Sequence, residues 1–556
     1  MMKNELRRGF CGILAAFLLF AALAFLAVRL APPQTARSTE EEAQELREIE
    51  ALCAVPAANA AVQPLLEIER CWEIEDTHQE TPGLVARMTM DGSELGFDAE
   101  SHTFYCSLGM KNESWPELPL SAAGPDGLQA AWTDDYAWDE VASAIASGTA
   151  YQLIAWTETE YEYFHIVFTG LPVVTLHTQD WAAMNDDYMP SRLTVSAAGY
   201  AGIDSPAEAH LRSGGDNRSH DKLSYRVAFK TENKKGRLKD NALSVLDMGE
   251  DSDWLLIASP KDNTCLLNHL GFDLWNRWNP DGDAFALLPN RMVELFVEDQ
   301  YQGIYGMQPP VRPKKELARV KNGENGLAAR IVMTHNPGTR PRRDVQKYIG
   351  ALLELRRRTD KLTDEQALAL FDDYAKLSAR EGFQLEDDAF LELAEKRVNL
   401  RDIFNYWLFF QAVGLGDDNV WNNAWVWAVP DDSGELRYSV SPWDMDMCFE
   451  GVEEQRINRQ WTLPIRLLTL DALGSRELVH ALWTEKRGTI LTRDAFNKWL
   501  EDAGNELTQS GAYARESQKW WGEAMDLELD TLMNKGWDRI MALEACLNEE
   551  WPVTSK

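Results

Sequence analysis

Gly416-Asp-Asp-Asn-Val-Trp-Asn-Asn423 begins the stretch of sequence that decides the fold, and Tyr438-Ser-Val-Ser-Pro-Trp-Asp444-Met-Asp446-Met-Cys-Phe449 ends it. Between these two pieces, the apolar run Ala424-Trp-Val-Trp427 is followed by the turn signal Asp431-Asp-Ser-Gly434. Apolar runs on both sides of such a turn predict a β-hairpin. Two clusters of carboxylate and amide side chains therefore bracket one hairpin.

Asp444 and Asp446 carry the clearest chemical signal in this stretch. Side chains alternate along an extended strand, so we predict that both aspartates lie on one face, opposite Trp443, Met445 and Met447. Two carboxylates about 4 Å apart repel by roughly 4 kcal/mol at an effective dielectric constant of about 20, so a cation, a base or a proton is needed between them. Mg2+ is the natural cation, because it is hard and prefers oxygen ligands.

Asp418 and Asn423 have the D-x-x-x-x-N spacing of a kinase catalytic loop. In such loops the Asp accepts the proton of the acceptor hydroxyl, the Asn binds a metal ion, and a later Asp holds the other metal position. The same spacing also arises by chance in an Asx-rich turn after a helix. The aspartates at 444 and 446, which follow in the expected order, favour the catalytic interpretation.

The segments around this stretch predict an α+β fold. Asn399 is placed to cap a helix that extends through Leu415 and is apolar on nearly all sides, which is typical of a buried helix. A capping box at 363–366 predicts another helix, and residues 462–551 have helical spacing throughout. Apolar runs that predict strands occur at 170–176, 224–229, 254–258 and 292–297.

Short runs of β-branched and aromatic residues predict a small β-sandwich-like domain before residue 170. Its aromatic residues form either a sugar-binding surface or, as is commoner on strands, core and cross-strand pairs. The domains that we expect are a cytoplasmic tip and membrane anchor at 1–30, a linker at 31–64, the β domain at 65–169, a kinase-like domain at 170–455 and a helical C-terminal subdomain at 456–556.

The N-terminal segment predicts a single membrane span. Lys3, Arg7 and Arg8 precede an uncharged run from Gly9 to Val28, which is long enough as a helix to cross roughly 30 Å of hydrocarbon. The positive-inside rule places this short basic end in the cytoplasm and the body of the protein in an extracytoplasmic space. A cleaved signal peptide is the alternative interpretation.

Composition excludes some classes of function. The net charge of −34 argues against non-specific binding to DNA or RNA, because such binding depends on many Lys and Arg contacts to phosphate. None of the seven cysteines has C-x-x-C spacing, so a zinc site is poorly supported. The six cysteines outside the predicted span are either disulfide-bonded or buried as single thiols.

Several short pieces between Leu171 and Glu450 occur in an order that is typical of one family. They are Leu171-Pro-Val-Val, Leu211-Arg212-Ser-Gly-Gly, Lys222-Leu-Ser-Tyr225-Arg-Val, Asp253-Trp-Leu-Leu-Ile-Ala with Asp262-Asn-Thr, Val293-Glu-Leu-Phe-Val-Glu-Asp-Gln-Tyr301-Gln-Gly303-Ile-Tyr305, the Asp418–Asn423 loop and Pro442-Trp443-Asp444-Met-Asp446. In these pieces the chain resembles the CotH kinases, atypical secreted or spore-coat kinases that are named for a spore coat protein.

The resemblance implies a protein-kinase-like fold without a glycine-rich phosphate loop, and it implies ATP with Mg2+ or Mn2+ as cofactors. It also implies transfer of the γ-phosphoryl group to Ser or Thr of surface or coat proteins. The residue roles that it implies are phosphate contact for Arg212 and Lys222, catalytic base for Asp418, metal ligation for Asn423 and Asp444, and support of a second metal position for Asp446.

Two departures from the family pattern favour an alternative, a non-catalytic scaffold or adhesion protein that keeps the kinase-like fold. Pro309 stands where the family often has a glutamate, so we expect the acid partner of Lys222 to be missing there. The family's Arg-Gly-Asn-Ser element is replaced by Arg212-Ser-Gly-Gly. Because no piece of the resemblance precedes residue 170, we also expect the small β domain to fold alone and to be dispensable for nucleotide binding.

A run of basic residues between Arg312 and Arg358 stands out in this acidic chain. It predicts either a surface for a polyanion such as polyphosphate, or a solvated face that balances the surrounding acidic residues.

Overall fold

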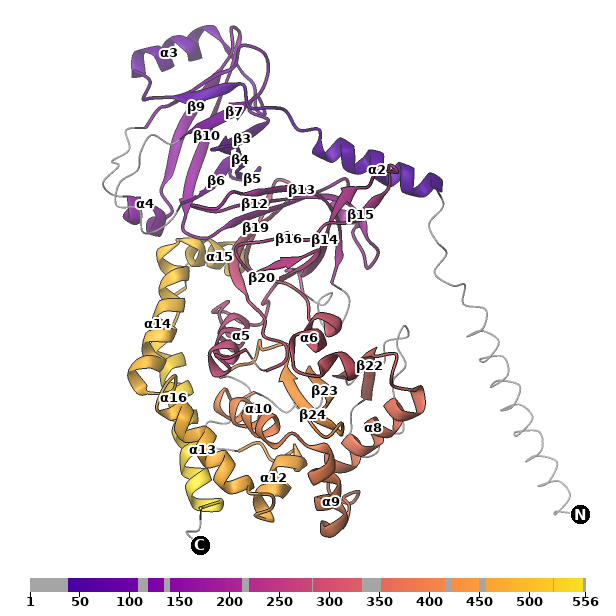
Figure 1. Ribbon diagram of the computed structural model, residues 1–556. Coiled ribbons are helices and arrows are strands. Elements are labelled where there is room, and N and C mark those ends of the chain that lie inside the picture. The colour runs from indigo at the N-terminus through magenta and orange to yellow at the C-terminus, as the bar shows by residue number, and fades with distance from the viewer. Residues whose placement is uncertain are drawn as a thin grey trace, which may run out of the picture.

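The computed structural model describes residues 39–108, 119–134, 141–212, 220–282, 284–332, 352–415, 423–449, 457–523 and 525–553. These residues form three parts that follow one another from top to bottom in Figure 1: a β domain, a β-barrel and a larger body of helices and a small sheet. The predicted α+β class is confirmed.

The β domain is built on one ten-stranded sheet that curls over its own core. Met88 lies near one end of the strand order and Phe104 near the other, yet both belong to the same buried cluster, as in a sandwich. Its strands are β1 Ala60–Gln63, β2 Gln79–Glu80, β3 Arg87–Met90, β4 Ser93–Glu94, β5 Gly96–Asp98, β6 Thr103–Ser107, β7 Leu120–Ala123, β8 Gln129–Trp132, β9 Ala150–Trp156 and β10 Glu160–Thr169. Its helices are α3 Ile68–Thr77 and α4 Val141–Ser147.

The middle part is a closed barrel. Its strands are β11 Val173–Thr178, β12 Met189–Ser196, β13 Ile203–Leu211, β14 Tyr225–Glu232, β18 Asp253–Ile257, β19 Arg291–Val297 and β20 Gln300–Gln308. They pair in the order β11-β12-β13-β14-β18-β20-β19, and β19 then pairs in parallel with β11, which closes the ring. The interior is filled by apolar side chains such as Val174, Leu193, Phe229 and Trp254. Outside the ring lie β15 Leu238–Asp240, β16 Leu243–Ser244 and β17 Glu250–Asp251.

The larger body contains a four-stranded sheet and most of the helices. The strands are β21 Leu327–Val332, β22 Leu352–Arg358, β23 Ala424–Pro430 and β24 Leu436–Pro442. The helices are α5 Leu267–Trp278, α6 Pro313–Arg319, α8 Asp364–Leu377, α9 Asp387–Arg397, α10 Leu400–Ala412, α12 Thr462–Thr469, α13 Ser475–Arg487, α14 Arg493–Gln509, α15 Ala512–Trp521 and α16 Leu529–Glu550.

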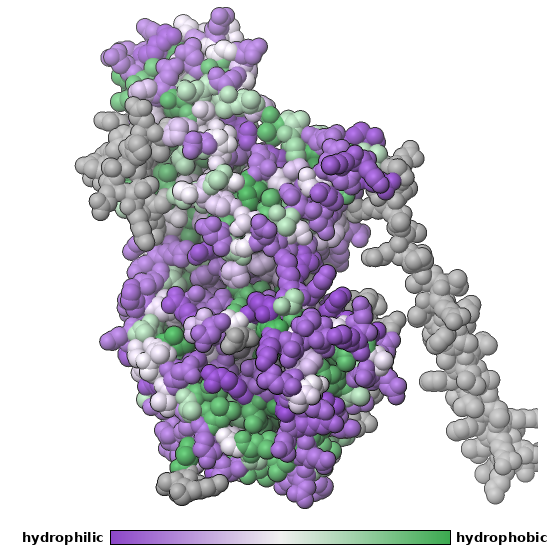
Figure 2. All heavy atoms as spheres, in the orientation of Figure 1, coloured by the Kyte–Doolittle hydropathy of each residue, from purple (hydrophilic) through white to green (hydrophobic). Residues whose placement is uncertain are grey.

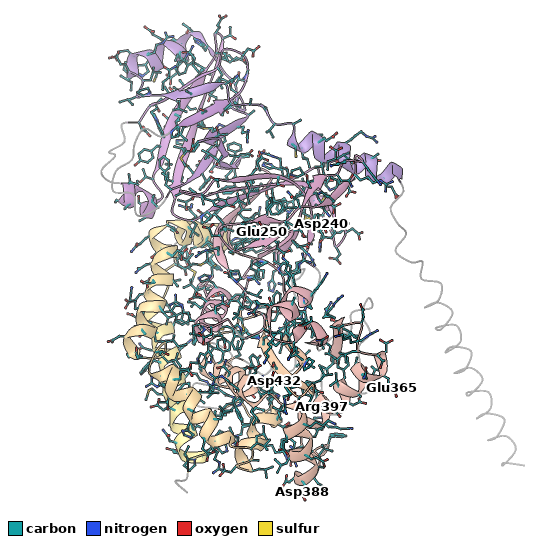
Figure 3. All side chains as sticks on the ribbon, in the orientation of Figure 1. Asp240, Glu250, Glu365, Asp388, Arg397 and Asp432 are labelled. Carbon is teal, nitrogen blue, oxygen red and sulfur yellow. The ribbon has the colours of Figure 1, made fainter. Side chains whose placement is uncertain are left out.

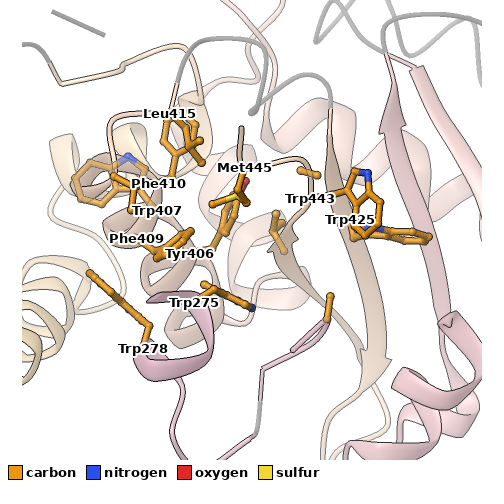
Figure 4. Packing of buried hydrophobic residues seen from close by; sticks show 14 of the residues in the cluster. Trp275, Trp278, Tyr406, Trp407, Phe409, Phe410, Leu415, Trp425, Trp443 and Met445 are labelled. Carbon is orange, nitrogen blue, oxygen red and sulfur yellow. The ribbon is translucent and has the colours of Figure 1, made fainter. Parts of the chain in front are cut away.

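Helix α10 forms the centre of this body, as its apolar sequence predicts. The side chain of Asn399 accepts a hydrogen bond from the backbone of Asp402 and caps the helix. Trp275 and Trp278 of α5 pack edge-on against Phe409 of α10, with ring centroids 5.0 and 5.6 Å apart (Figure 4). Burial of each such side chain contributes about 1.5–3 kcal/mol, so α5 and α10 form a rigid base for the loops above them.

The described part of the segment at 31–64, the predicted linker, contains regular structure. Helix α2, Thr39–Cys53, lies along β12 and β13 of the barrel, and its Ile49 is 2% exposed. Strand β1 also falls within the predicted linker, but it pairs with β7 and β8 and therefore belongs to the β domain. An amphipathic pattern alone does not show that a helix has a sheet to pack on, which is why a linker was expected.

Hydrophilic residues cover most of the face shown in Figure 2, in keeping with the strongly acidic composition. Within the described residues, no helix is both long and apolar enough to cross a membrane. The predicted span at 9–28 lies outside those residues. All six cysteines of the described part are free thiols, which agrees with the second of the two interpretations of the cysteines.

Candidate functional site

The hairpin β23–β24 brings Asn423, the described residue of the first polar cluster, close to the start of the second cluster. Ala424 is paired with Pro442, so Asn423, just before β23, lies beside the residues that follow β24. Asn423 and Asp444 both have left-handed backbone conformations, with φ of 63° and 60°. Asn and Asp adopt this conformation more readily than other residues with a side chain, and backbone strain of this kind is concentrated at functional sites.

The prediction that Asp444 and Asp446 lie on one face of a strand is wrong. Strand β24 ends at Pro442, and the left-handed Asp444 interrupts the alternation of side chains before a turn. This turn is held by α5, where the side chain of Asn268 accepts a hydrogen bond of 2.9 Å from the backbone N–H of Met445. A Cβ on Gly271 of α5 would lie 2.4 Å from the Cβ of Met445, so only glycine allows this close contact.

The two aspartates are nevertheless electrostatically coupled. Burial and the negative charge of Asp444 raise the pKa of Asp446 to about 6. Two carboxylates that resist ionising together, with the amide of Asn423 at the paired end of the hairpin, are oxygen donors of the kind that Mg2+ prefers. Within the described residues, no three His, Cys, Asp or Glu side chains are grouped to hold a metal ion. Two carboxylates still fit Mg2+, because this ion is usually bound by one or two carboxylates together with phosphates and water.

Two arginines flank Trp443, the residue before these aspartates. The guanidinium carbons of Arg212, at the end of β13, and of Arg330, on β21, each lie 5.8 Å from the centre of the indole ring. Burial and the positive charge of Arg212 lower the pKa of Arg330 to about 10. Arg330 donates a 3.3 Å hydrogen bond to Asn423, while its buried Nε has no partner. This cationic pair is suited to an anionic group, and the sequence pattern did not single out Arg330.

Lys222, in the segment just before β14, is 4% exposed and forms an ion pair with Glu516, which is 1% exposed. Its ammonium group also donates to the carbonyl of Ile304 at 2.9 Å and lies 5.1 Å from the ring centre of Tyr305. Glu516 belongs to α15, in the segment that was predicted to be a separate C-terminal subdomain. The acid that is absent at Pro309 is therefore supplied by a different element, so its loss there does not leave Lys222 without a carboxylate partner.

Gly303 explains how this carboxylate reaches the barrel. The backbone N–H of Ile304 donates to Oε2 of Glu516 at 2.6 Å. Gly303 has a left-handed φ of 92°, and a Cβ at this position would lie 1.9 Å from the same oxygen. The Gly-Ile-Tyr motif in the sequence is thus the part of β20 that the carboxylate of Glu516 contacts.

Five of the six predicted site residues lie in the described part of the chain. The negative charge of Asp262 acts on Asp446 and also on Cys265, the thiol next to Glu516. Arg212 acts on Asp446 as well. The sixth predicted residue, Asp418, lies in 416–422, outside the described residues.

The basic run between Arg312 and Arg358 is engaged mainly in local ion pairs. Arg312 contacts Asp251 at 2.8 Å, and Lys321 contacts Asp432, labelled in Figure 3, at 2.5 Å. Residues 333–351 of the run lie outside the described part. These pairs favour the interpretation of a charge-balanced face, and the polyanion partner stays a prediction.

A buried pair between a lysine next to the barrel and a glutamate from a helix, with two aspartates after a hairpin in the helical body, is similar to the arrangement of parts in protein kinases. Comparison with family models agrees: residues 211–533 match the model described as CotH kinase protein. The chain belongs to this family, and the resemblance noted in the sequence is confirmed. A comparison with curated proteins found no match.

The extent of the match bears on the predicted domain boundary at 455. It continues through α12–α15 to residue 533, so it includes Glu516. The helices from α12 to α15 lie within the matched residues, and α15 supplies the glutamate that pairs with Lys222.

Proposed function

We propose that the protein is an extracytoplasmic atypical kinase, held at the membrane by the segment at 9–28, that transfers the γ-phosphoryl group of ATP to Ser or Thr of surface or coat proteins. The observation that carries this proposal is the buried pair of Lys222 and Glu516. A lysine is costly to bury, and in protein kinases a lysine that is paired with a glutamate from a helix is part of the machinery that positions the phosphates.

The cationic groups around the site supply the contacts for phosphates. The guanidinium groups of Arg212 and Arg330 both lie close to the Trp443 ring, and Asp444 and Arg212 both act electrostatically on Arg330. Guanidinium groups bind phosphate oxygens with two parallel hydrogen bonds, so this pair is suited to hold a phosphoryl group in a fixed orientation.

The acidic groups have separate roles in the proposal. Asn423, Asp444 and Asp446 would hold Mg2+ or Mn2+, which when bound neutralises the charge of the phosphates. Asp418 takes the proton of the acceptor hydroxyl, a role that rests on its spacing from Asn423 and on the family.

The test is metal-dependent nucleotide binding, measured by calorimetry with and without Mg2+ or Mn2+, together with phosphorylation of the protein itself. We expect Asp444→Asn to abolish the metal-dependent part of ATP binding. Asp418→Asn should keep most of this binding and lower phosphoryl transfer by on the order of a hundredfold or more. If the parent protein binds no nucleotide under these conditions, the kinase proposal fails and the alternative, a non-catalytic scaffold of the same fold, takes its place.

A further inference from the structure

Helix α15 inserts two consecutive side chains into the barrel wall. Next to Glu516, Arg515 forms a bidentate ion pair with the fully buried Glu294 of β19, with N–O distances of 2.9 and 2.8 Å. The hydroxyl of Tyr301 donates to the same carboxylate at 2.7 Å. The position of Glu516, and hence its reach to Lys222, is therefore set by how α15 lies on the barrel.

The β domain contacts the beginning of this helix through hydrogen bonds and close packing. The carbonyl of Ser510, at the corner between α14 and α15, accepts hydrogen bonds from the hydroxyl of Thr169 at 3.2 Å and from the backbone of Gly170 at 3.3 Å. Gly511, the N-cap of α15, is packed so closely on the β domain that a Cβ there would lie 2.2 Å from the carbonyl oxygen of Ile145. In Figure 1, α15 lies directly beneath the β domain and α4.

Aromatic packing connects the same two elements. Tyr105 of β6 stacks on Tyr301 of the barrel, with centroids 5.6 Å apart and an interplanar angle of 6°. The guanidinium carbon of Arg515 lies 5.7 Å from the centre of the Tyr105 ring. Tyr105 of the β domain thus contacts both Arg515 and Tyr301, and Tyr301 donates a hydrogen bond to Glu294, the ion-pair partner of Arg515.

We propose that the β domain is the positioning element of the site: it fixes α15 so that Glu516 meets Lys222, and it thereby sets the affinity for nucleotide. The effect on nucleotide affinity rests on the proposed kinase function. The positioning of α15 by the β domain does not depend on it. It replaces the expectation that the β domain is dispensable for nucleotide binding. By reciprocity of coupled equilibria, any ligand that loosens or tightens the β domain on α15 changes nucleotide affinity, and nucleotide changes the affinity for that ligand.

Two glycines at the ends of α15 provide a matched experiment in the full chain. Gly511 and Gly522 have left-handed φ values of 72° and 77°, so alanine strains the backbone similarly at both. At Gly511 the added Cβ collides with the carbonyl of Ile145 in the β domain and also lies 2.8 Å from Nη1 of Arg515, whereas nothing lies within 4 Å of it at Gly522. We expect Gly511→Ala to speed hydrogen exchange of the amides of residues 513–517 and to weaken Mg·ATP binding about tenfold, and Gly522→Ala to do neither.

A gentler variant tests the same coupling without a collision. Thr169→Val keeps the shape of the side chain and removes its hydrogen bond to Ser510, so it should speed exchange at 513–517 to a smaller extent. If the Gly511 and Gly522 variants show equal exchange in α15 and equal affinity, the β domain does not position this helix. If the parent binds no Mg·ATP, the kinase proposal fails, and the exchange rates alone decide whether the coupling exists.

Discussion

Lys222 and Glu516 form a buried ion pair although 294 residues separate them in the chain. Each partner is also bound to the same residue of β20, because Lys222 donates to the carbonyl of Ile304 and Glu516 accepts from its N–H. The pair and the strand therefore form one closed polar network in an apolar setting, and such a network is costly to break at one member.

Removal of one charge from this network should affect stability and binding together. We expect Glu516→Gln to lower the free energy of unfolding by about 3–5 kcal/mol and to abolish Mg·ATP binding, because an unpaired ammonium group is left buried. The double variant Lys222→Met with Glu516→Leu should regain much of that stability in urea denaturation but not the binding. A single variant that binds Mg·ATP like the parent would contradict the assigned role of the pair.

Any side chain at position 303 should displace the carboxylate of Glu516. In Gly303→Ala the methyl group occupies the place of Oε2 of Glu516, so we expect a loss of nucleotide affinity beyond the cost of left-handed strain. Gly249→Ala is the control, since Gly249 has a similar φ of 85° and no atom within 4 Å of the added Cβ. Thermal unfolding and calorimetric titration of both variants separate strain from displacement, and equal affinities would show that Glu516 does not depend on this close approach.

Arg330 should show a trade-off between stability and binding. Burial and Arg212 lower its pKa to about 10, which means that the fold disfavours the charged form. We therefore expect Arg330→Met to raise the free energy of unfolding by on the order of 1 kcal/mol and to weaken Mg·ATP binding about tenfold. Arg277→Met, at an exposed pair with Asp273, should change neither. A destabilised Arg330→Met protein with normal affinity would assign this arginine a structural role instead.

Glu94 should make stability depend on pH where the β domain meets the barrel. It accepts hydrogen bonds from Arg87 at 2.6 Å and from His177 at 2.8 Å. Burial opposes ionisation, but hydrogen bonds from His177 and Arg192 prevail and lower the pKa of Glu94 from 4.5 to about 2.

Because this pKa is lower in the folded state, the carboxylate stabilises the fold above pH 4.5, and its contribution is lost as the pH falls towards 2. We expect Glu94→Gln to lower the free energy of unfolding by about 3 kcal/mol at neutral pH, with a difference from the parent that shrinks between roughly pH 5 and 2. Glu100→Gln, whose side chain is 85% exposed, is the control. A pH-independent difference would assign the loss to packing rather than to charge.

Local signals in the sequence predicted local structure well. The capping box at Thr363 and Gln366 is present, the cap at Asn399 begins α10, and the hairpin with its flanking polar residues lies where the turn signal placed it. Each of these features depends on residues within a few positions of one another, so their pattern is visible in one sequence.

The residues that were missed depend on contacts between distant segments. Glu516 lies on an amphipathic helix with nothing in its spacing to indicate a buried partner, and Arg330 became a candidate only once β21 was seen beside β23. The left-handed turn at Asp444 has a similar origin, because the packing of Met445 on Gly271 of α5 overrides the strand pattern of the sequence.

The place of α15 in the chain also determines when the site is assembled during translation. The barrel segment that carries Lys222 leaves the ribosome first, and Glu516 is added 294 residues later. A nascent chain, or one released at a premature stop codon before α15, thus has the lysine but not the carboxylate that pairs with it. Under the proposed function, such an incomplete molecule is expected to lack nucleotide binding, so the direction of protein synthesis itself would keep it inactive.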